Sequence, residues 1–231
     1  MKTQAAAILH WYKHLDASFP MPSGIHMMDP YADPQTWKIV EVFYKKFYGD
    51  PHPRVFIYGI NPGRFGGGIT GIPFTDPQHL AEQCGIPNPW QKKYELSAQF
   101  VYKVVEIFGG PKAFYRHFFI SAMSPLGFTW NNKNLNYYDN KELLRASEPF
   151  ILQCIRQSLD TMPTIDTCFC LGEGENYRQF RRINDEHRFF KEIIPLPHPR
   201  WVMQYRRKSI GEFAAIYVEK LSAVLSEYDL L

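Results

Sequence analysis

The sequence lacks the cysteine spacings, membrane spans and nucleotide-binding loops that assign many chains to a class. Its four cysteines form no Cys-x-x-Cys pair, which argues against structural zinc and iron–sulfur clusters and favours buried free thiols in a reducing compartment (Cys84, Cys154, Cys168 and Cys170). No apolar run approaches the length of a membrane span. The apolar stretch near the N-terminus is soon interrupted by polar residues, so no signal peptide is predicted. We therefore expect a cytoplasmic protein with no metal, no other cofactor and no membrane contact.

The net charge of the chain is small. The 231 residues carry a formal net charge of +3, which is too mild to imply a nucleic-acid partner by itself. The distribution is uneven, because residues 176–208 hold nine Lys or Arg residues against three acidic ones. From charge alone, a solvated helix face is the favoured interpretation of this segment.

The composition is that of a folded protein. Apolar residues make up 45% of the chain and charged residues 21%, and 231 residues suit one α/β domain (1–231), with residues 1–50 as its N-terminal helical part. Aromatic residues reach 16%, an excess that fits a large core and equally fits a binder of flat ligands.

Four β-type runs alternate with helical patterns. The runs are rich in Val, Ile, Phe or Cys and end at Gly, Pro, Asn or Asp (54–59, 118–123, 166–172 and 190–196). Apolar residues at helical spacing lie between them, and Ser147-Glu148-Pro149 has the pattern of a helix start. This alternation predicts a mostly parallel sheet with helices on both faces, in which ligands bind beyond the carboxyl ends of the strands.

A glycine-rich segment, residues 59–74, follows the first predicted strand. It is neither a Walker loop nor a Gly-x-Gly-x-x-Gly turn, but its glycines let the backbone approach a ligand closely. Asn61 is held between the strand end and Pro62, and Phe74 follows Pro73. The alternative interpretation is an ordinary surface loop with a core phenylalanine.

A histidine between two prolines follows the last predicted strand. An isolated histidine is more often structural than catalytic, but His198 stands at a carboxyl-end loop ahead of a basic stretch, which favours function. Trp201, Val202 and Met203 are apolar residues on an expected loop. They suit a wedge that enters a base stack, and they also suit a cover over the core.

These segments resemble the two signature motifs of the uracil-DNA glycosylase superfamily. The first motif matches Gly59-Ile60-Asn61-Pro62-Gly63 with Thr70-Gly71-Ile72-Pro73-Phe74, and the second matches His198-Pro199. Three further segments have counterparts in the family (Glu95-Leu96-Ser97, Phe118-Phe119-Ile120 with Ser124-Pro125-Leu126, and Lys133-Asn134-Leu135). The similarity runs from about Arg54 to the C-terminal helix and is greatest to the single-strand-selective monofunctional branch, here in a divergent bacterial-type form.

The resemblance implies a fold and a set of roles. The fold is a three-layer α/β/α sandwich with a central four-stranded parallel sheet. Asn61 would position the attacking water, and His198 would stabilise the negative charge that grows on the departing base. The base pocket would comprise Gly59, Ile60, Gly63, Phe65, Phe74, Ala122 and Ser124. The wedge and phosphate contacts would comprise Arg200, Trp201, Val202, Met203, Arg206, Arg207 and Lys208.

Two positions depart from the family pattern. Ala122 stands where relatives have an asparagine that reads the pyrimidine edge, and alanine makes no such contact, so bases other than uracil are expected to enter. Ser121 or Ser124 is a candidate to replace part of that contact. Arg200-Trp201 follows His-Pro where relatives continue Ser-Pro-Arg, so the wedge is assigned only as a segment.

The sequence thus predicts a monomeric base-excision-repair enzyme that removes uracil, and also xanthine or hypoxanthine, from single- or double-stranded DNA. No lysine lies in either motif, so no lyase step is expected. Two alternatives stay open. One is a non-catalytic module that binds single-stranded or damaged DNA, and the other is a small-molecule hydrolase or nucleotide enzyme on the same fold.

Overall fold

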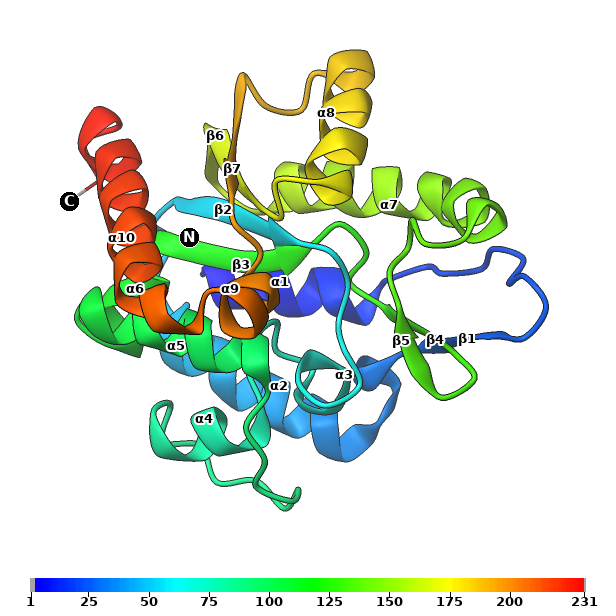
Figure 1. Cartoon of the computed structure of the whole chain (residues 1–231), viewed down its shortest axis with the longest axis horizontal. Coiled ribbons are helices and arrows are strands. Elements are labelled where there is room, and N and C mark those ends of the chain that lie inside the picture. The colour runs from blue at the N-terminus through cyan, green and yellow to red at the C-terminus, as the bar shows by residue number, and fades with distance from the viewer. Residues whose placement is uncertain (1–2, 231) are drawn as a thin grey trace.

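A four-stranded parallel sheet lies at the centre of the computed structural model, which describes residues 3–230 (Figure 1). The strand order is β3-β2-β6-β7, with β2 (Arg54–Gly59) and β6 (Thr164–Leu171) inside and β3 (Phe118–Ala122) and β7 (Glu192–Leu196) at the edges. Every residue of β2 is buried, because β2 is paired on both sides and covered on both faces. The four predicted strands and their parallel arrangement are confirmed.

One face of the sheet is covered by helices from the N-terminal part and the middle of the chain. They are α1 (Gln4–Lys13), α2 (Pro34–Phe47), α7 (Lys141–Thr161) and α8 (Glu175–His187). Phe119 of β3 contacts Trp11 of α1 edge-on, with ring centroids 6.3 Å apart, and Tyr58 of β2 contacts Phe180 of α8 at 5.1 Å. A 3-10 turn, η1 (Pro30–Ala32), precedes α2.

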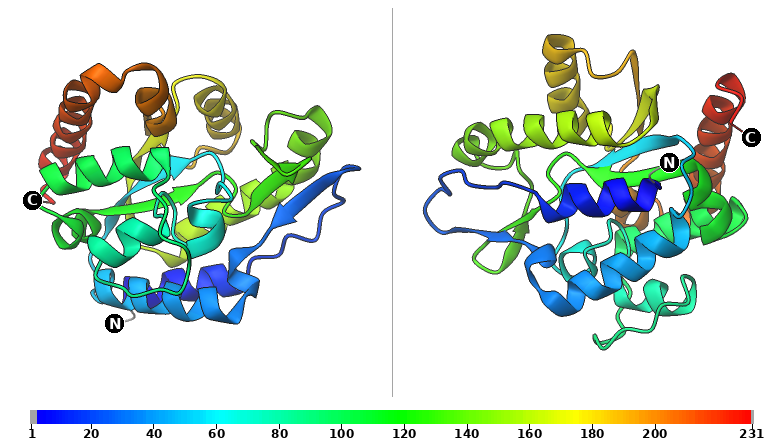
Figure 2. Two further views of the ribbon diagram at one scale, coloured as in Figure 1. Left: turned by 60° about the horizontal axis from the view of Figure 1, so that its bottom comes forward. Right: turned by 180° about the vertical axis from the view of Figure 1, so that it is seen from behind.

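The opposite face is covered by α5 (Leu96–Ile107), α6 (Pro111–His117) and α10 (Ile210–Glu227). Phe118 of β3 packs against Phe108, which caps α5, at 5.3 Å, and Phe100 packs against Tyr217 of α10 at 5.0 Å. Figure 2 shows the sheet between these helices and α1 and α2. The chain is therefore a three-layer α/β/α sandwich, as the resemblance implied.

A second, antiparallel sheet was not predicted. It consists of β1 (Ile25–Met28), β4 (Gly127–Trp130) and β5 (Lys133–Leu135), in the order β1-β4-β5. Asn131 and Asn132 join β4 to β5 with φ angles of 48° and 57°, the left-handed conformation that a two-residue hairpin turn needs. Strands of three and four residues show too little alternation to be seen in the sequence.

Two predictions about local structure are wrong. Helix α7 begins at Lys141 and not at Ser147, because the side chain of Asn140 caps it by accepting hydrogen bonds from two backbone N–H groups; Pro149 lies inside the helix. The segment after His198 is not a loop but the helix α9 (Pro199–Tyr205), followed by the 3-10 turn η2 (Arg207–Ser209). Two short helices, α3 (Gly67–Thr70) and α4 (Pro77–Glu82), occupy the region around the glycine-rich segment.

The four cysteines are buried and form no disulfide, as expected. Burial raises the pKa of the Cys84 thiol to about 11, so this thiol stays protonated near neutral pH. Within residues 3–230, no helix combines the length and the apolar character needed to cross a membrane.

Candidate active site

A cavity of about 380 Å³ opens at the carboxyl ends of β2, β3 and β7. Its walls come from five regions: the glycine-rich segment, the start of α5, the end of β3, the β4–β5 hairpin with the residues that follow it, and helix α9 with His198 at its start. A cavity of this size suits a small flat ligand. Asn61, Phe74, Ala122 and His198 all line it, so the sheet brings together residues that are far apart in the sequence.

The side-chain amide of Asn61 is fixed by two backbone groups of the hairpin segment. Its Nδ2 donates to the carbonyl oxygen of Leu135 at 3.1 Å, and its Oδ1 accepts from the backbone N–H of Tyr137 at 3.0 Å. A carbonyl oxygen can only accept and a backbone N–H can only donate, so the amide has one orientation. One Nδ2 hydrogen and one Oδ1 lone pair remain for a ligand or a water molecule.

His198 is a neutral hydrogen-bond donor toward the cavity. Its Nδ1 accepts from the backbone N–H of Arg200 at 3.1 Å, so the ring proton of the neutral form lies on Nε2. Burial, together with the nearby charge of Arg200, lowers the pKa of His198 to about 4. The preceding carbonyl, of Pro197, accepts from the hydroxyl of Tyr217, which anchors this turn to α10. The imidazole is therefore held in one tautomer near neutral pH.

Phe74 forms an aromatic wall of the cavity. It is a non-glycine residue with a φ of 54°, a conformation that costs energy and needs support from its surroundings. The Thr70 hydroxyl gives that support by donating to the Thr75 carbonyl at 2.6 Å. A Cβ on Gly59 would lie only 2.6 Å from the Phe74 ring, so the ring occupies space that only glycine leaves free.

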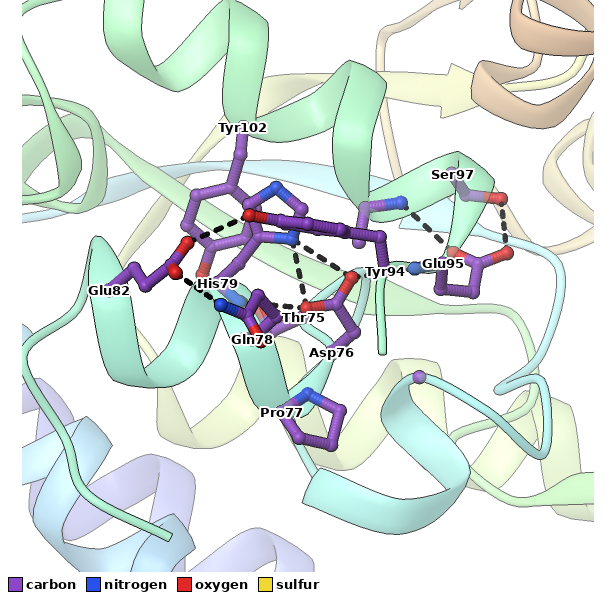
Figure 3. A network of polar contacts seen from close by, with 12 residues as sticks. Thr75, Asp76, Pro77, Gln78, His79, Glu82, Tyr94, Glu95, Ser97 and Tyr102 are labelled. Atoms are coloured by element: carbon purple, nitrogen blue, oxygen red, sulfur yellow. Dashed lines mark hydrogen bonds and ion pairs between the residues drawn. The ribbon is translucent and has the colours of Figure 1, made fainter. Parts of the chain in front are cut away.

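A buried polar network connects the Phe74 loop to α5 (Figure 3). Asp76, which is fully buried, accepts from the backbone N–H of Glu95 at 2.7 Å and is hydrogen-bonded to Nδ1 of the His79 ring at 2.9 Å. The Glu95 carboxylate in turn accepts from the Ser97 hydroxyl at 3.1 Å and from the Ala98 N–H at 2.9 Å. The aromatic wall and the start of α5 therefore form one rigid unit, from which Glu95 and Ser97 line the cavity.

Four of the residues predicted for the base pocket line the cavity, namely Ile60, Gly63, Phe74 and Ala122. Gly59 lies directly beneath the Phe74 ring. Phe65 and Ser124 do not belong to the lining. Phe65 is half exposed, with the Arg64 guanidinium 4.6 Å from its ring centroid, and Ser124 is fully buried, with its hydroxyl donating to the Leu126 carbonyl at 2.7 Å.

The end of β3 places no polar side chain in the cavity that could hydrogen-bond the edge of a base. Ala122, whose side chain is a methyl group, lines the cavity. Ser121 alternates to the other face of the strand, where its hydroxyl is buried without a partner in the described chain, so neither serine replaces the missing asparagine. The hairpin instead contributes two amides, Asn134 and Asn136. The Lys133-Asn134-Leu135 match was the signal in the sequence that could have placed them at the site.

Helix α9 divides the predicted wedge. Arg200 and Trp201 line the cavity, together with Gln204 and Tyr205, which the sequence reasoning missed. Val202 and Met203 were expected on the wedge but are buried, because they lie on the side of α9 that packs into the core. The prediction that these two residues belong to the wedge is therefore wrong, and they form part of the core.

The basic segment is also divided. On α8, Arg178 pairs with Glu175 at 2.7 Å and Arg182 pairs with Glu148. Arg206, Arg207 and Lys208 are exposed next to α9, and the Arg206 guanidinium lies 4.8 Å from the Trp201 ring centroid. The positive charge that is close to the cavity is therefore the part on α9 and η2.

The cavity of this parallel α/β/α sandwich presents an amide, a neutral imidazole and an aromatic wall, which are groups that a DNA glycosylase can use. The sequence profile described as "Uracil DNA glycosylase superfamily" matches residues 47–222. The chain belongs to this superfamily, as its motifs indicated, and is a hydrolase of base excision repair.

The chain is also similar to a solved structure along nearly its whole length. That structure is "The crystal structure of WT Pedobacter heparinus SMUG2". The sequence identity is 43%, the TM-score is 0.94, and the match covers 98% of this chain and 100% of the other. Agreement at this level shows that the two chains share one architecture.

Proposed function

We propose that this protein is a monofunctional glycosylase that hydrolyses the bond between a deaminated base and its deoxyribose in DNA. Uracil is the first expected substrate, with xanthine and hypoxanthine as further ones. The observation that carries the proposal is the pairing of the fixed Asn61 amide with the neutral His198 imidazole on one cavity. A water-orienting group and a donor for the leaving group are the two parts that this hydrolysis needs.

The reaction uses a nucleotide that has left the base stack. The flipped base stacks on Phe74. As the bond from the sugar C1′ to the base nitrogen breaks, its electron pair goes to the base, and Nε2–H of His198 donates to the base oxygen on which negative charge grows. Asn61 holds the water whose oxygen bonds to C1′. The proton that this water releases ends on the departed base, which leaves as a neutral molecule.

Relaxed base selection follows from Ala122. An amide at this position would discriminate among bases because a wrong base would leave it unpaired. The methyl group imposes no such requirement, which supports entry of purines as well as uracil. The cavity lining in the described chain contains no lysine, and this supports hydrolysis without a Schiff-base intermediate.

Binding to DNA is assigned to α9 and η2. Trp201 and Tyr205 are 38% and 66% exposed at the cavity rim, so they are the side chains available to fill the gap left by the flipped base. Arg200 and residues 206–208 would contact phosphates on single- or double-stranded DNA. Action as a monomer and a cytoplasmic location stay predictions.

Base release from oligonucleotides that carry a single uracil, xanthine or hypoxanthine tests the proposal. We expect Asn61→Ala and His198→Ala to slow release by about 100-fold or more each. His10→Ala, which removes an exposed imidazole from α1, is the matched control and should behave as the wild type. Full activity in both site variants would refute the mechanism. Tight binding of damaged DNA by the wild type without any release would favour the non-catalytic module.

A further inference from the structure

The two backbone groups that hold Asn61 come from residues 135 and 137, and the residue between them is Asn136. Because the Asn61 amide bonds to Leu135 on one side and Tyr137 on the other, Asn136 is held next to that amide. Asn136 is half-buried and lines the same cavity. The hairpin thus brings a second amide to the position where the proposed function places the water.

A water molecule that attacks a carbon atom must direct a lone pair toward it. The water does so in one orientation only when both of its hydrogens are donated to fixed acceptors. One acceptor leaves the molecule free to rotate about a single hydrogen bond. Asn61 offers one Oδ1 lone pair, because the other is used by the Tyr137 N–H. A second acceptor is therefore required for full alignment.

The side-chain oxygens that the hairpin and the start of α5 bring to the cavity differ in how many hydrogen bonds they already accept. The Asn134 Oδ1 accepts one hydrogen bond, from the Arg64 N–H at 3.1 Å, and the two Glu95 oxygens each accept one from α5, so part of the acceptor capacity of each is already engaged. The Asn136 side chain donates through Nδ2 to Asp139 Oδ1 at 3.3 Å. Its own Oδ1 accepts no hydrogen bond from any residue between positions 3 and 230.

Asp139 also fixes the direction of that free oxygen. Its carboxylate accepts from the backbone N–H of Asn136 at 2.9 Å, and its own N–H donates to the Asn136 carbonyl at 3.0 Å. Three contacts with one residue hold the turn, and the Nδ2 contact turns Oδ1 away from Asp139. The amide therefore presents a preoriented acceptor and needs no rearrangement to use it.

We propose that Asn136 Oδ1 is the second acceptor for the nucleophilic water, and that Asn61 and Asn136 together orient it. This inference rests on the proposed function. One hydrogen of the water is donated to Asn61 Oδ1 and the other to Asn136 Oδ1. The oxygen bonds to C1′ as the bond to the base breaks, and the released proton passes to the base anion through solvent. Asn136 then contributes to the rate of the chemical step and to the choice of nucleophile.

Methanol distinguishes this role from a merely structural one. Methanol has a single O–H, so it cannot satisfy two acceptors, and a site with two acceptors favours water over methanol. We would measure single-turnover base release from a uracil oligonucleotide in water–methanol mixtures and determine the ratio of methyl glycoside to abasic product. We expect Asn136→Ala to slow release by about 10- to 100-fold. We expect it also to raise the methanol-to-water ratio by about 2- to 10-fold, the value of one lost hydrogen bond.

Two further variants make the result decisive. Asn134→Ala removes an amide from the same hairpin whose oxygen already accepts a hydrogen bond from the Arg64 N–H, and it should leave the methanol-to-water ratio unchanged. The exchange Asn136→Asp with Asp139→Asn restores both an acceptor at position 136 and its hydrogen bond to position 139. The double variant should return the ratio to the wild-type value.

The experiment distinguishes failure of the proposed function from failure of the inference about Asn136. No base release by the wild type would mean that the proposed function and this inference both fall. Release by the wild type, together with an unchanged ratio in Asn136→Ala, would overturn only the inference. A ratio raised equally by Asn134→Ala would also overturn it, because the effect would then be one of hairpin position and not of the free acceptor.

Discussion

Replacing Asn61 by aspartate changes one heavy atom of the site, from nitrogen to oxygen. The variant tests whether the residue acts through the hydrogen bonds that fix its side chain or through an ability to take a proton from water. The Oδ1 contact with the Tyr137 N–H would survive, but the Nδ2 that now donates to the Leu135 carbonyl at 3.1 Å would become an oxygen. Two acceptors would then face each other without a proton between them. On basicity alone, a carboxylate should activate water better than an amide does. The geometry predicts the opposite outcome for Asn61→Asp.

The expected magnitude comes from the lost contact. A hydrogen bond is replaced by a pair of unsatisfied acceptors in a half-buried place, at a cost of about 2 kcal/mol. For a chain of this length, that loss lowers the Tm by about 4–8 °C. The repulsion also raises the pKa of the new carboxyl group above its ordinary value of about 4, because the protonated form can donate to the Leu135 carbonyl.

The pH dependence of this variant has a definite sign. A carboxyl group whose pKa is raised by folding contributes stability below its unfolded pKa, and that contribution is lost as the pH rises through the folded pKa. The Tm difference between Asn61→Asp and the wild type should therefore be largest near pH 8 and narrow toward pH 4. Thermal unfolding across this range, with single-turnover base release near pH 7.5, measures both effects. We expect release to be at least about 10-fold slower than in the wild type. A variant as fast as the wild type, with a Tm difference that does not change with pH, would refute the reasoning.

Three other perturbations test separate parts of the site. The pKa of about 4 for His198 predicts a base-release rate with no inflection near pH 6.5 and a decline only as the pH approaches 4; a step near pH 6.5 that disappears in His198→Gln would contradict this. Gly59→Ala places a methyl group within 2.6 Å of the Phe74 ring, so release should fall by at least about 10-fold while binding of abasic DNA changes little, as a titration of labelled oligonucleotide will show. Alanine at all three of residues 206–208 should reduce the slope of log affinity against log salt by about 2 to 3, and an unchanged slope would place the phosphate contacts elsewhere.

The central sheet could be predicted because its strands are buried on both faces. Such strands appear as short apolar runs with sharp ends, and helical patterns between them imply parallel pairing. The residues at the strand ends follow from the same reasoning, since the carboxyl ends of parallel strands meet. This reasoning alone predicts that Asn61, Phe74 and His198 lie at one edge of the sheet, and the resemblance adds a role for each.

The elements that the sequence did not reveal depend on long-range contacts. The β4–β5 hairpin has strands of three and four residues, and its amides reach the cavity only through its packing against the glycine-rich segment. Helix α9 is not predicted because Trp201, Val202 and Met203 form a continuous apolar run, which does not show that Trp201 lies on a different face of the helix from the two buried residues. Burial of Val202 at 0% exposure is a property of its packing against α5, which no local pattern records.

The hydrogen bonds between the Asn61 side chain and the backbone of residues 135 and 137 determine which mutations the site can tolerate during evolution. They also determine what must be transferred with the site to another protein. Main-chain atoms are the same for nearly every residue type, so substitutions at Leu135 and Tyr137 can accumulate without removing the groups that align the amide. An inserted or deleted residue in the hairpin, in contrast, would shift both anchors at once. A designer who transplants the first motif to a new scaffold must therefore carry the hairpin with it, because the motif alone brings an asparagine with no fixed direction.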